Sequence, residues 1–248
     1  MDRVAFSIFG IDVMWYGILM AIGIILGTLL ALKEAKRVGI KEDDVLDLAI
    51  FAIPIGLLSA RLYYVIFNWE YYSQNVSQIL NFRAGGMAIH GALIGGILTG
   101  YIFTKIRKIN FLKMADAVMI GMPLAQAIGR WGNFINQEAH GGPTDLPWGI
   151  MVDGVKVHPT FLYESIWDAA IFIFLWIFRK KKKYEGQIIT YYITLYSLGR
   201  FFIEGLRTDS LMIGHLRMAQ VISLIGVIVG VISHIYLSKK NKNDTIEE

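Results

Sequence analysis

Long apolar runs alternate with short polar segments along most of this chain. An α-helix needs about 20 predominantly apolar residues to cross a bilayer, and these runs are close to that length and lack the one-sided stripe of a soluble helix. The pattern predicts an all-α, polytopic membrane bundle with seven transmembrane helices. The expected spans are 13–32, 45–67, 87–104, 112–128, 159–178, 188–203 and 218–237.

Lysine and arginine gather in alternate connections between these spans. Most of the 24 basic residues follow the first span, separate the third from the fourth, or follow the fifth and the seventh. Because basic loops stay in the cytoplasm, we expect the N-terminus outside and the C-terminus inside the cell. The longest polar segments, near 68–86, 129–158 and 204–217, then lie on the extracytoplasmic side.

No break in composition, flexible linker or repeat divides residues 1–248, so we expect a single integral-membrane domain. The first apolar run is long enough to span, so the N-terminus does not resemble a cleaved signal peptide. The net charge of +4 follows from cytoplasmic lysines that face anionic lipid headgroups, and no nucleic-acid partner is expected. The chain has no cysteine, which excludes a disulfide and an internal thiol nucleophile.

A dense polar cluster, GRWGNFINQEAHGG, occupies residues 129–142 after the fourth expected span. An unsatisfied polar group in hydrocarbon is costly, so the cluster predicts a site. On a helical pitch, Arg130, Asn133 and Gln137 share one face. Glu138 is a candidate internal partner for an arginine. The plainer alternative is an Arg–Glu pair that only joins two helices.

A second cluster forms one stripe of the sixth expected span. Tyr196, Arg200, Glu204 and Arg207 are spaced four, four and three residues apart. The expected topology places this stripe at the same depth as Arg130. Two arginines from different helices are therefore expected to converge on one anion, such as a phosphate. The alternative, a side chain that extends to the membrane interface, applies mainly to Arg207.

Three further residues of the expected spans are candidates. His90 would exchange a proton, pair with a phosphate or only be hydrogen-bonded, since imidazole as a side-chain type suits all three roles. Arg61, deep in the second span, needs either a helix partner or a lipid headgroup. Tyr16 opens the first span on the outer side. No HExxH or similar ligand spacing is present in the sequence, so no metal is expected.

These segments together resemble the bacterial phosphatidylglycerol:prolipoprotein diacylglyceryl transferases. The matching pieces run through nearly the whole chain in the same order, and the block 129–141 is the most specific. They are Tyr16, His90-Gly91, residues 129–138 with Gly141, His158-Pro159-Thr160, Tyr163-Glu164 and residues 196–207.

The resemblance implies a reaction. The diacylglyceryl group of phosphatidylglycerol moves to the lipobox cysteine thiol in the signal peptide of a prolipoprotein, a thioether forms, and glycerol phosphate leaves. It also implies a multi-pass enzyme of the bacterial cytoplasmic (inner) membrane, surrounded by membrane lipids. Its active site faces the extracytoplasmic side, and no cofactor is needed.

Physical chemistry adds residue roles to this implied reaction. The leaving phosphate gains negative charge, so Arg130 and Arg200 are the expected catalytic clamp. His90 is the expected base for the thiol, although the arginines alone would also lower the thiol pKa. Asn133 would orient the headgroup, while Glu138 and Glu204 would hold the arginines in place. The full set of expected substrate contacts is Tyr16, Arg61, Asn133, Asn136, Glu138, Gly141, Tyr196, Glu204 and Arg207.

Two other classes of protein compete with this interpretation. A transporter or channel for an anion would need polar residues through the midplane and usually two repeated halves, and neither is visible in the sequence. A lipid-binding structural subunit would lack transfer activity, so a transfer assay separates both classes from an enzyme.

Overall fold

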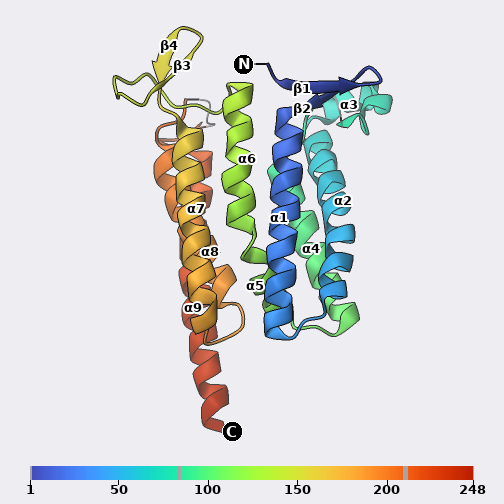
Figure 1. Ribbon diagram of the computed structural model, residues 1–248, viewed down its shortest axis with the longest axis vertical. Helices are drawn as coiled ribbons and strands as arrows, with labels where there is room; N and C mark the ends of the chain where they lie inside the picture. The colour runs from blue at the N-terminus through green and yellow to red at the C-terminus, as the bar shows by residue number, and fades with distance from the viewer. Residues whose placement is uncertain (1, 83–84, 209–211, 248) are drawn as a thin grey trace. The chain divides into compact units, whose positions relative to one another are not determined.

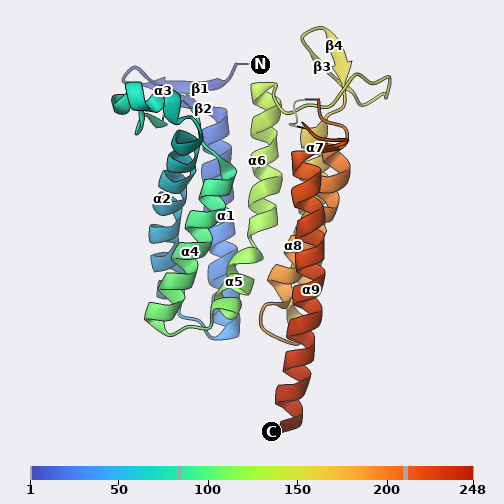
Figure 2. The ribbon, with the colours of Figure 1, turned by 180° about the vertical axis from the view of Figure 1, so that it is seen from behind.

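Most of the described residues are helical (Figure 1, Figure 2). The structure, a computed structural model, describes residues 2–82, 85–208 and 212–247. The chain forms two compact units, the first from Met1–Glu34 with Asp116–Glu248 and the second from Ala35–Ala115. The single-domain organisation expected from the sequence stays a prediction.

The first unit is built mainly from four helices. Helix α7 packs against both α6 and α8, and α8 packs against α9. Apolar side chains from α7 and α8, including Leu175 and Ile188, form its buried core with Ile120. The helices that lie wholly or partly in this unit are α1 (Trp15–Val38), α5 (Phe111–Met119), α6 (Met122–Asn136), α7 (Thr160–Phe178), the 3₁₀ turn η3 (Arg179–Lys181), α8 (Gln187–Glu204) and α9 (Met218–Glu247).

The second unit is centred on two long helices, α2 (Glu42–Phe67) and α4 (Ile89–Arg107), which pack against each other. The connection between them contains α3 (Trp69–Gln74) and the 3₁₀ turn η1 (Val76–Gln78). A Cβ on Gly91 would overlap the main chain of Ser59, so this close approach of α4 to α2 needs a glycine.

The all-α expectation missed three short antiparallel hairpins in the first unit. Each turns through two residues that include a glycine with positive φ: Gly10, Gly154 or Gly214. Two of the hairpins lie in segments expected to be polar connections, 129–158 and 204–217, and the end of the first hairpin overlaps the start of the first expected span at residue 13. The hairpins are β1 (Val4–Ile8) with β2 (Ile11–Met14), β3 (Ile150–Val152) with β4 (Val155–Val157), and β5 (Met212–Ile213) with β6 (Leu216–Arg217).

The fourth expected span is not one straight helix. It breaks between α5 and α6, which are bent by 43°. At the break, a Cβ on Gly121 would overlap the main chain of Gly27 on α1, and Pro123 in the first turn of α6 has no N–H to donate. Helix α6 then continues to Asn136, so the first part of the segment 129–158 is helix and not loop.

The protein is a membrane protein by the length and composition of its helices. Among the described residues, α1, α2, α4, α7 and α9 are long and apolar enough to cross a bilayer, and counting the bent pair of α5 and α6 as one span raises the number from 5 to 6. Helix α8 falls outside this set, because Arg200, Glu204 and several hydroxyl groups reduce its hydropathy. The expected span at 188–203, and with it the total of seven, therefore stays a prediction.

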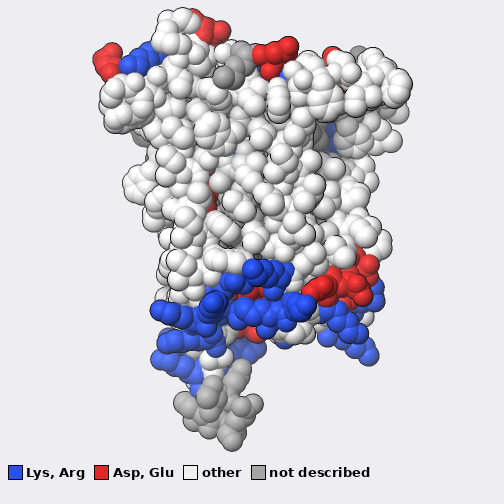
Figure 3. Space-filling model, in the orientation of Figure 1, with Lys and Arg blue, Asp and Glu red and all other residues white. Residues whose placement is uncertain are grey.

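Basic side chains gather at one end of the first unit. Figure 3 shows Lys and Arg near the end of α7 and along the last part of α9. At this end, Arg179 and Glu34 form a buried ion pair of 2.6 Å. Asp116 accepts hydrogen bonds from the backbone N–H groups of Gly186 and Ile189, at 2.8 and 3.0 Å, and so caps the start of α8.

Candidate active site

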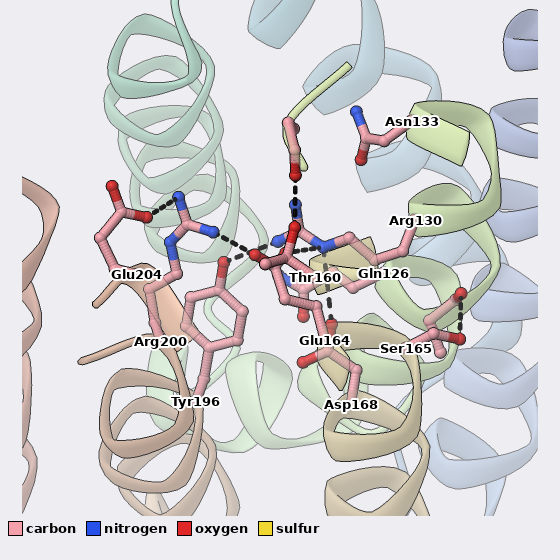
Figure 4. A network of polar contacts seen from close by, with 12 residues as sticks. Gln126, Arg130, Asn133, Thr160, Glu164, Ser165, Asp168, Tyr196, Arg200 and Glu204 are labelled. Carbon is pink, nitrogen blue, oxygen red and sulfur yellow. Dashed lines mark hydrogen bonds and ion pairs between the residues drawn. The ribbon is translucent and has the colours of Figure 1, made fainter. Parts of the chain in front are cut away.

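Two arginines from different helices contact one carboxylate in the first unit (Figure 4). Arg130 on α6 places its Nε 2.6 Å from Oε2 of Glu164 on α7. Arg200 on α8 donates from Nη1 to Oε1 of the same carboxylate. The two guanidinium groups thus meet on one anion, as the sequence predicted, and that anion is an internal side chain.

Two more carboxylates add negative charge to the cluster. Glu204 lies 2.7 Å from Nη2 of Arg200, one helical turn away on α8. Asp168 lies 3.9 Å from Nε of Arg130. The exposed fractions of Glu164, Asp168 and Glu204 are 4%, 2% and 3%. Charges so deeply buried persist in an apolar bundle because each has an opposite charge beside it.

Arg207 follows the end of α8 and reaches the same carboxylate, with Nη1 3.9 Å from Oε1 of Glu164. Its main chain forms a β-bridge with Gly141, whose N–H donates to the His158 carbonyl at 2.9 Å. A Cβ on Gly141 would overlap His158 and come within 3.0 Å of the Leu206 carbonyl oxygen. Gly141 therefore allows the close packing of three chain segments that positions Arg207.

Two tyrosines expected in the site border α6. The hydroxyl of Tyr196 accepts a hydrogen bond of 3.2 Å from Nη2 of Arg130. The ring of Tyr16 packs directly on Gly132, where any Cβ would overlap it. Both rings therefore lie beside the α6 segment that carries Arg130.

Helix α6 ends at Asn136, whereas the predicted polar face needs the helix to continue through Gln137. Gln137 adopts a left-handed conformation with φ of 54°, so the expected face of Arg130, Asn133 and Gln137 is wrong for Gln137. Glu138 folds back, and its Oε1 accepts hydrogen bonds from Nδ2 of Asn133 and Asn136 at 3.0 and 3.2 Å. Within the described part of the chain, these amides hold Glu138, instead of the expected arginine.

Arg61 is fully buried in the second unit and contacts main-chain oxygens. These contacts differ from both roles expected of it, a helix partner and a headgroup ligand. The arginine ties the loop before α4 to α2. Its guanidinium donates to the carbonyl groups of Gln78 at 2.7 Å, Ile79 at 2.8 Å, Gly86 at 2.8 Å and Gly85.

His90 lies in the first turn of α4, in the second unit. Its ring is tilted against that of Tyr63, with ring centroids 6.1 Å apart. The N–H of Ala88 donates to the Ala60 carbonyl at 3.0 Å, which fixes the start of α4 on α2. The role of His90 as a base stays a prediction.

Sequence reasoning missed the central position of Glu164 and the presence of Asp168, although Glu164 belongs to the family resemblance. A signal was available, because these two acidic residues lie four positions apart inside an otherwise apolar run. An acidic residue in a span needs a partner, and this spacing places both on one helix face.

The space enclosed by the cluster is small. Its volume is about 10 Å³, bordered by Arg130, Glu164, Asp168, Tyr196 and Arg200. A cavity needs about 10–15 Å³ to hold one water molecule, so a phosphate enters only if these side chains move apart. Within the residues that the structure describes, no group of three or more His, Asp or Glu side chains is placed to hold a metal ion.

Fold and site together define an integral membrane protein whose apolar helices enclose a buried cluster of arginines and carboxylates. Comparison with known proteins identifies the family within this class of membrane proteins. The family model described as Prolipoprotein diacylglyceryl transferase matches residues 3–236. The chain belongs to this family.

Three similar proteins carry the name phosphatidylglycerol–prolipoprotein diacylglyceryl transferase. One from Clostridioides difficile (strain 630) is 79% identical over 248 residues, which is 100% of both chains. One from Finegoldia magna is 54% identical over 241 residues, which is 97% of both chains. One from Clostridium novyi (strain NT) is 53% identical over 253 residues, which is 98% of both chains.

Proposed function

We propose that this chain is a phosphatidylglycerol:prolipoprotein diacylglyceryl transferase. It moves the diacylglyceryl group of phosphatidylglycerol to the lipobox cysteine thiol of a prolipoprotein, which is the first step of lipoprotein maturation. The observation that carries the site assignment is the meeting of Arg130 and Arg200 on Glu164, in a chain whose residues 3–236 match the transferase family.

The reaction exchanges one bond for another. Attack of the thiolate on C3 of the diacylglyceryl unit forms the C–S bond of the thioether and breaks the C–O bond to the phosphate. The electron pair of that bond leaves with glycerol phosphate, and the thiol proton passes to a base. Because negative charge grows on the phosphate oxygens, Arg130 and Arg200 stabilise the transition state more than the bound substrate.

Glu164 occupies the place that the lipid phosphate takes during the reaction. A carboxylate and a phosphate accept the same paired N–H donors of arginine. The cluster encloses only about 10 Å³, so the phosphate binds when Glu164 gives up at least one arginine contact. Asp168 and Glu204 remain beside Arg130 and Arg200 as counter-ions and hold them in place.

His90 is the proposed base for the incoming thiol. An unperturbed thiol has a pKa of about 8.5, so only a small fraction is thiolate at neutral pH. Comparing His90→Gln with the wild type across pH tests this role. The base role predicts a changed pH profile of kcat/KM, and an unchanged profile assigns the thiol activation to the arginines.

The enzyme lies in the bacterial inner membrane, among membrane lipids, with seven spans, its N-terminus outside and its C-terminus in the cytoplasm. Helix α8 is the sixth of these spans and completes the count of seven, and it packs between α7 and α9. The first unit supports this proposal. The C-terminal ends of α6 and α8 lie at one end of the unit, and the basic side chains near the end of α7 and along the last part of α9 lie at the other (Figure 1, Figure 3). The site then faces the extracytoplasmic side, where exported cysteines arrive.

A transfer assay tests the proposed function. Purified protein is incubated with labelled phosphatidylglycerol and a lipobox peptide, and a peptide with serine in place of cysteine is the substrate control. We expect Arg130→Ala and Arg200→Ala each to reduce kcat by about 10²–10³-fold, the loss typical of one oxyanion donor. Arg107→Ala, an exposed arginine on α4, is the matched control and should retain activity. Full activity of both site variants refutes the assignment.

A further inference from the structure

A larger cavity lies in the first unit, between the end of α6, the start of α7 and the β3–β4 hairpin. Its volume is about 260 Å³, and Asn133 is one of the residues that line it. Asn133 follows Arg130 by three residues on α6, a rise of about 4.5 Å at about 1.5 Å per residue. The cavity is therefore adjacent to the arginine cluster, and the reaction described above does not account for it.

One side of this cavity is apolar. Phe134 and Phe161 stack with their ring centroids 4.6 Å apart and form an aromatic wall. All three residues of β3, Ile150, Met151 and Val152, line it as well, and all three are apolar. This side suits an aliphatic side chain, because burying one removes apolar surface from water on both partners.

The other side presents hydrogen-bond acceptors. Asn133, Gln137 and Glu138 line it, and the carboxylate of Glu138 is held in position by the amides of Asn133 and Asn136. A lipid acyl chain has no N–H group to offer these oxygens, and covering them without a donor is costly. A peptide main chain carries a donor at each residue, so these groups favour a peptide over an acyl chain.

The outer edge of β3 adds a second feature that suits a peptide. Lys156 pairs with Met151 across the hairpin, and its carbonyl accepts from the Thr144 N–H at 2.9 Å on the side away from β3. In an antiparallel pair, the main-chain N–H and C=O groups of two opposite residues either both point toward the partner strand or both point away from it. Because the Lys156 carbonyl points away from β3, the N–H and C=O of Met151 point away from β4. Among the described residues no strand covers this edge, and Met151 is 62% exposed.

We propose that this cavity is the peptide subsite of the enzyme. It takes an aliphatic side chain of the peptide substrate, from an extended segment within about three residues of the reacting cysteine. Three extended residues span about 10 Å, at about 3.3 Å per residue. The segment adds to the edge of β3 through Met151, as in other cases of strand addition. This inference rests on the proposed function, because it assumes that a cysteine peptide is one substrate.

Steady-state kinetics with each substrate varied in turn test the subsite. Ile150→Trp fills the cavity, and Val155→Trp places the same bulk on β4, at a position that is 48% exposed and outside the cavity lining. We expect Ile150→Trp to raise KM for the lipobox peptide at least tenfold, with KM for phosphatidylglycerol within twofold of wild type. Val155→Trp should leave both values unchanged.

A second variant guards against a folding defect in Ile150→Trp. Met151→Pro removes the outward N–H and replaces a side chain of the cavity lining with a smaller one that does not fill the cavity. Proline is tolerated at a strand edge whose N–H faces solvent. It should also raise KM for the peptide selectively, with an unchanged melting temperature. An unchanged KM for the peptide in both variants overturns the subsite, as does a rise confined to the lipid KM. Absence of transfer by the wild-type protein would instead contradict the proposed function.

Discussion

At the scale of single residues, Glu164 is the side chain on which the cluster depends. Arg130 and Arg200 each use one of its two oxygens, and Arg207 lies 3.9 Å from one of them. Removing this carboxylate leaves three guanidinium groups close together with fewer counter-ions. Asp168 and Glu204 do not bridge the two arginines as Glu164 does, because Asp168 lies 3.9 Å from Nε of Arg130 and Glu204 pairs with Nη2 of Arg200 (Figure 4).

Glu164→Gln should destabilise the protein strongly and reduce transfer. The substitution keeps the shape of the side chain and removes its charge, and breaking a buried ion pair on one side costs about 3–5 kcal/mol. Thermal unfolding of the detergent-solubilised protein measures the loss. Glu70→Gln, an exposed carboxylate on α3, is the control. Equal melting temperatures for the two variants would show that Glu164 does not hold the cluster together.

Arg61→Lys should loosen the loop before α4. An arginine presents five N–H donors in a planar fork, whereas a lysine has one nitrogen and cannot reach carbonyl groups on both sides of the loop. Hydrogen exchange at residues 76–82 and 85–86 should therefore become faster in Arg61→Lys. Arg107→Lys, at the opposite end of the second unit, should leave this exchange unchanged. Wild-type protection in Arg61→Lys would count against a clamp on main-chain oxygens.

At the scale of elements, the ends and bends of helices depend on contacts that hydropathy does not encode. Helix α6 begins at a bend set by the close packing of Gly121 on Gly27, and it ends at Gln137 in a left-handed conformation. Helix α8 contains charged residues that the sequence alone marks as unusual for a span. Arg200 is accommodated because it pairs with Glu164 on α7 and with Glu204 on α8 itself.

Asp116→Ala should weaken the start of α8. The carboxylate accepts two backbone N–H groups and lies 3.1 Å from Lys182 Nζ. Burial acts to lower the pKa of Lys182, but Glu185 and Asp116 raise it overall, so the ammonium stays charged at neutral pH. Loss of a buried acceptor costs about 1–3 kcal/mol, and hydrogen exchange at residues 186–190 should increase.

Glu185→Gln is the matched control for this cap, since Glu185 also pairs with Lys182 but has a side chain that is 40% exposed. It should leave exchange at the start of α8 near the wild-type rate. Equal effects of the two substitutions would show that the start of α8 is stabilised by the ion pairs with Lys182 and not by the hydrogen bonds that Asp116 accepts from the backbone.

At the scale of the whole molecule, the chain offers a direct test of its proposed topology because it has no cysteine. Val155→Cys on β4 and Lys240→Cys near the end of α9 each introduce one thiol at an exposed position. In intact cells, a maleimide that cannot cross membranes should label Val155→Cys only. After permeabilisation both should react. The opposite labelling pattern would reverse the proposed orientation and place the site toward the cytoplasm.

Several features of the site were open to prediction from the sequence. The stripe of Tyr196, Arg200 and Glu204 depends only on helical spacing, and the structure places all three on α8. Glu138 and Arg61 could not be assigned in this way, because their hydrogen-bond partners are set by a chain reversal and by a loop. The same holds for Gly141, whose importance arises where three distant segments pack together.

Composition and hydrophobic patterning are enough to predict a helical membrane protein, to show where its charges gather, and to indicate that arginines within its spans need polar partners. These properties depend on local composition and on the cost of placing a charge in hydrocarbon. Three features emerge only from the folded chain: Glu164 is the anion shared by two arginines, α6 bends at one end and stops at Asn136, and the β3–β4 hairpin borders a cavity. Each of these depends on which distant residues come into contact, and hydrophobic patterns restrict such contacts without selecting one.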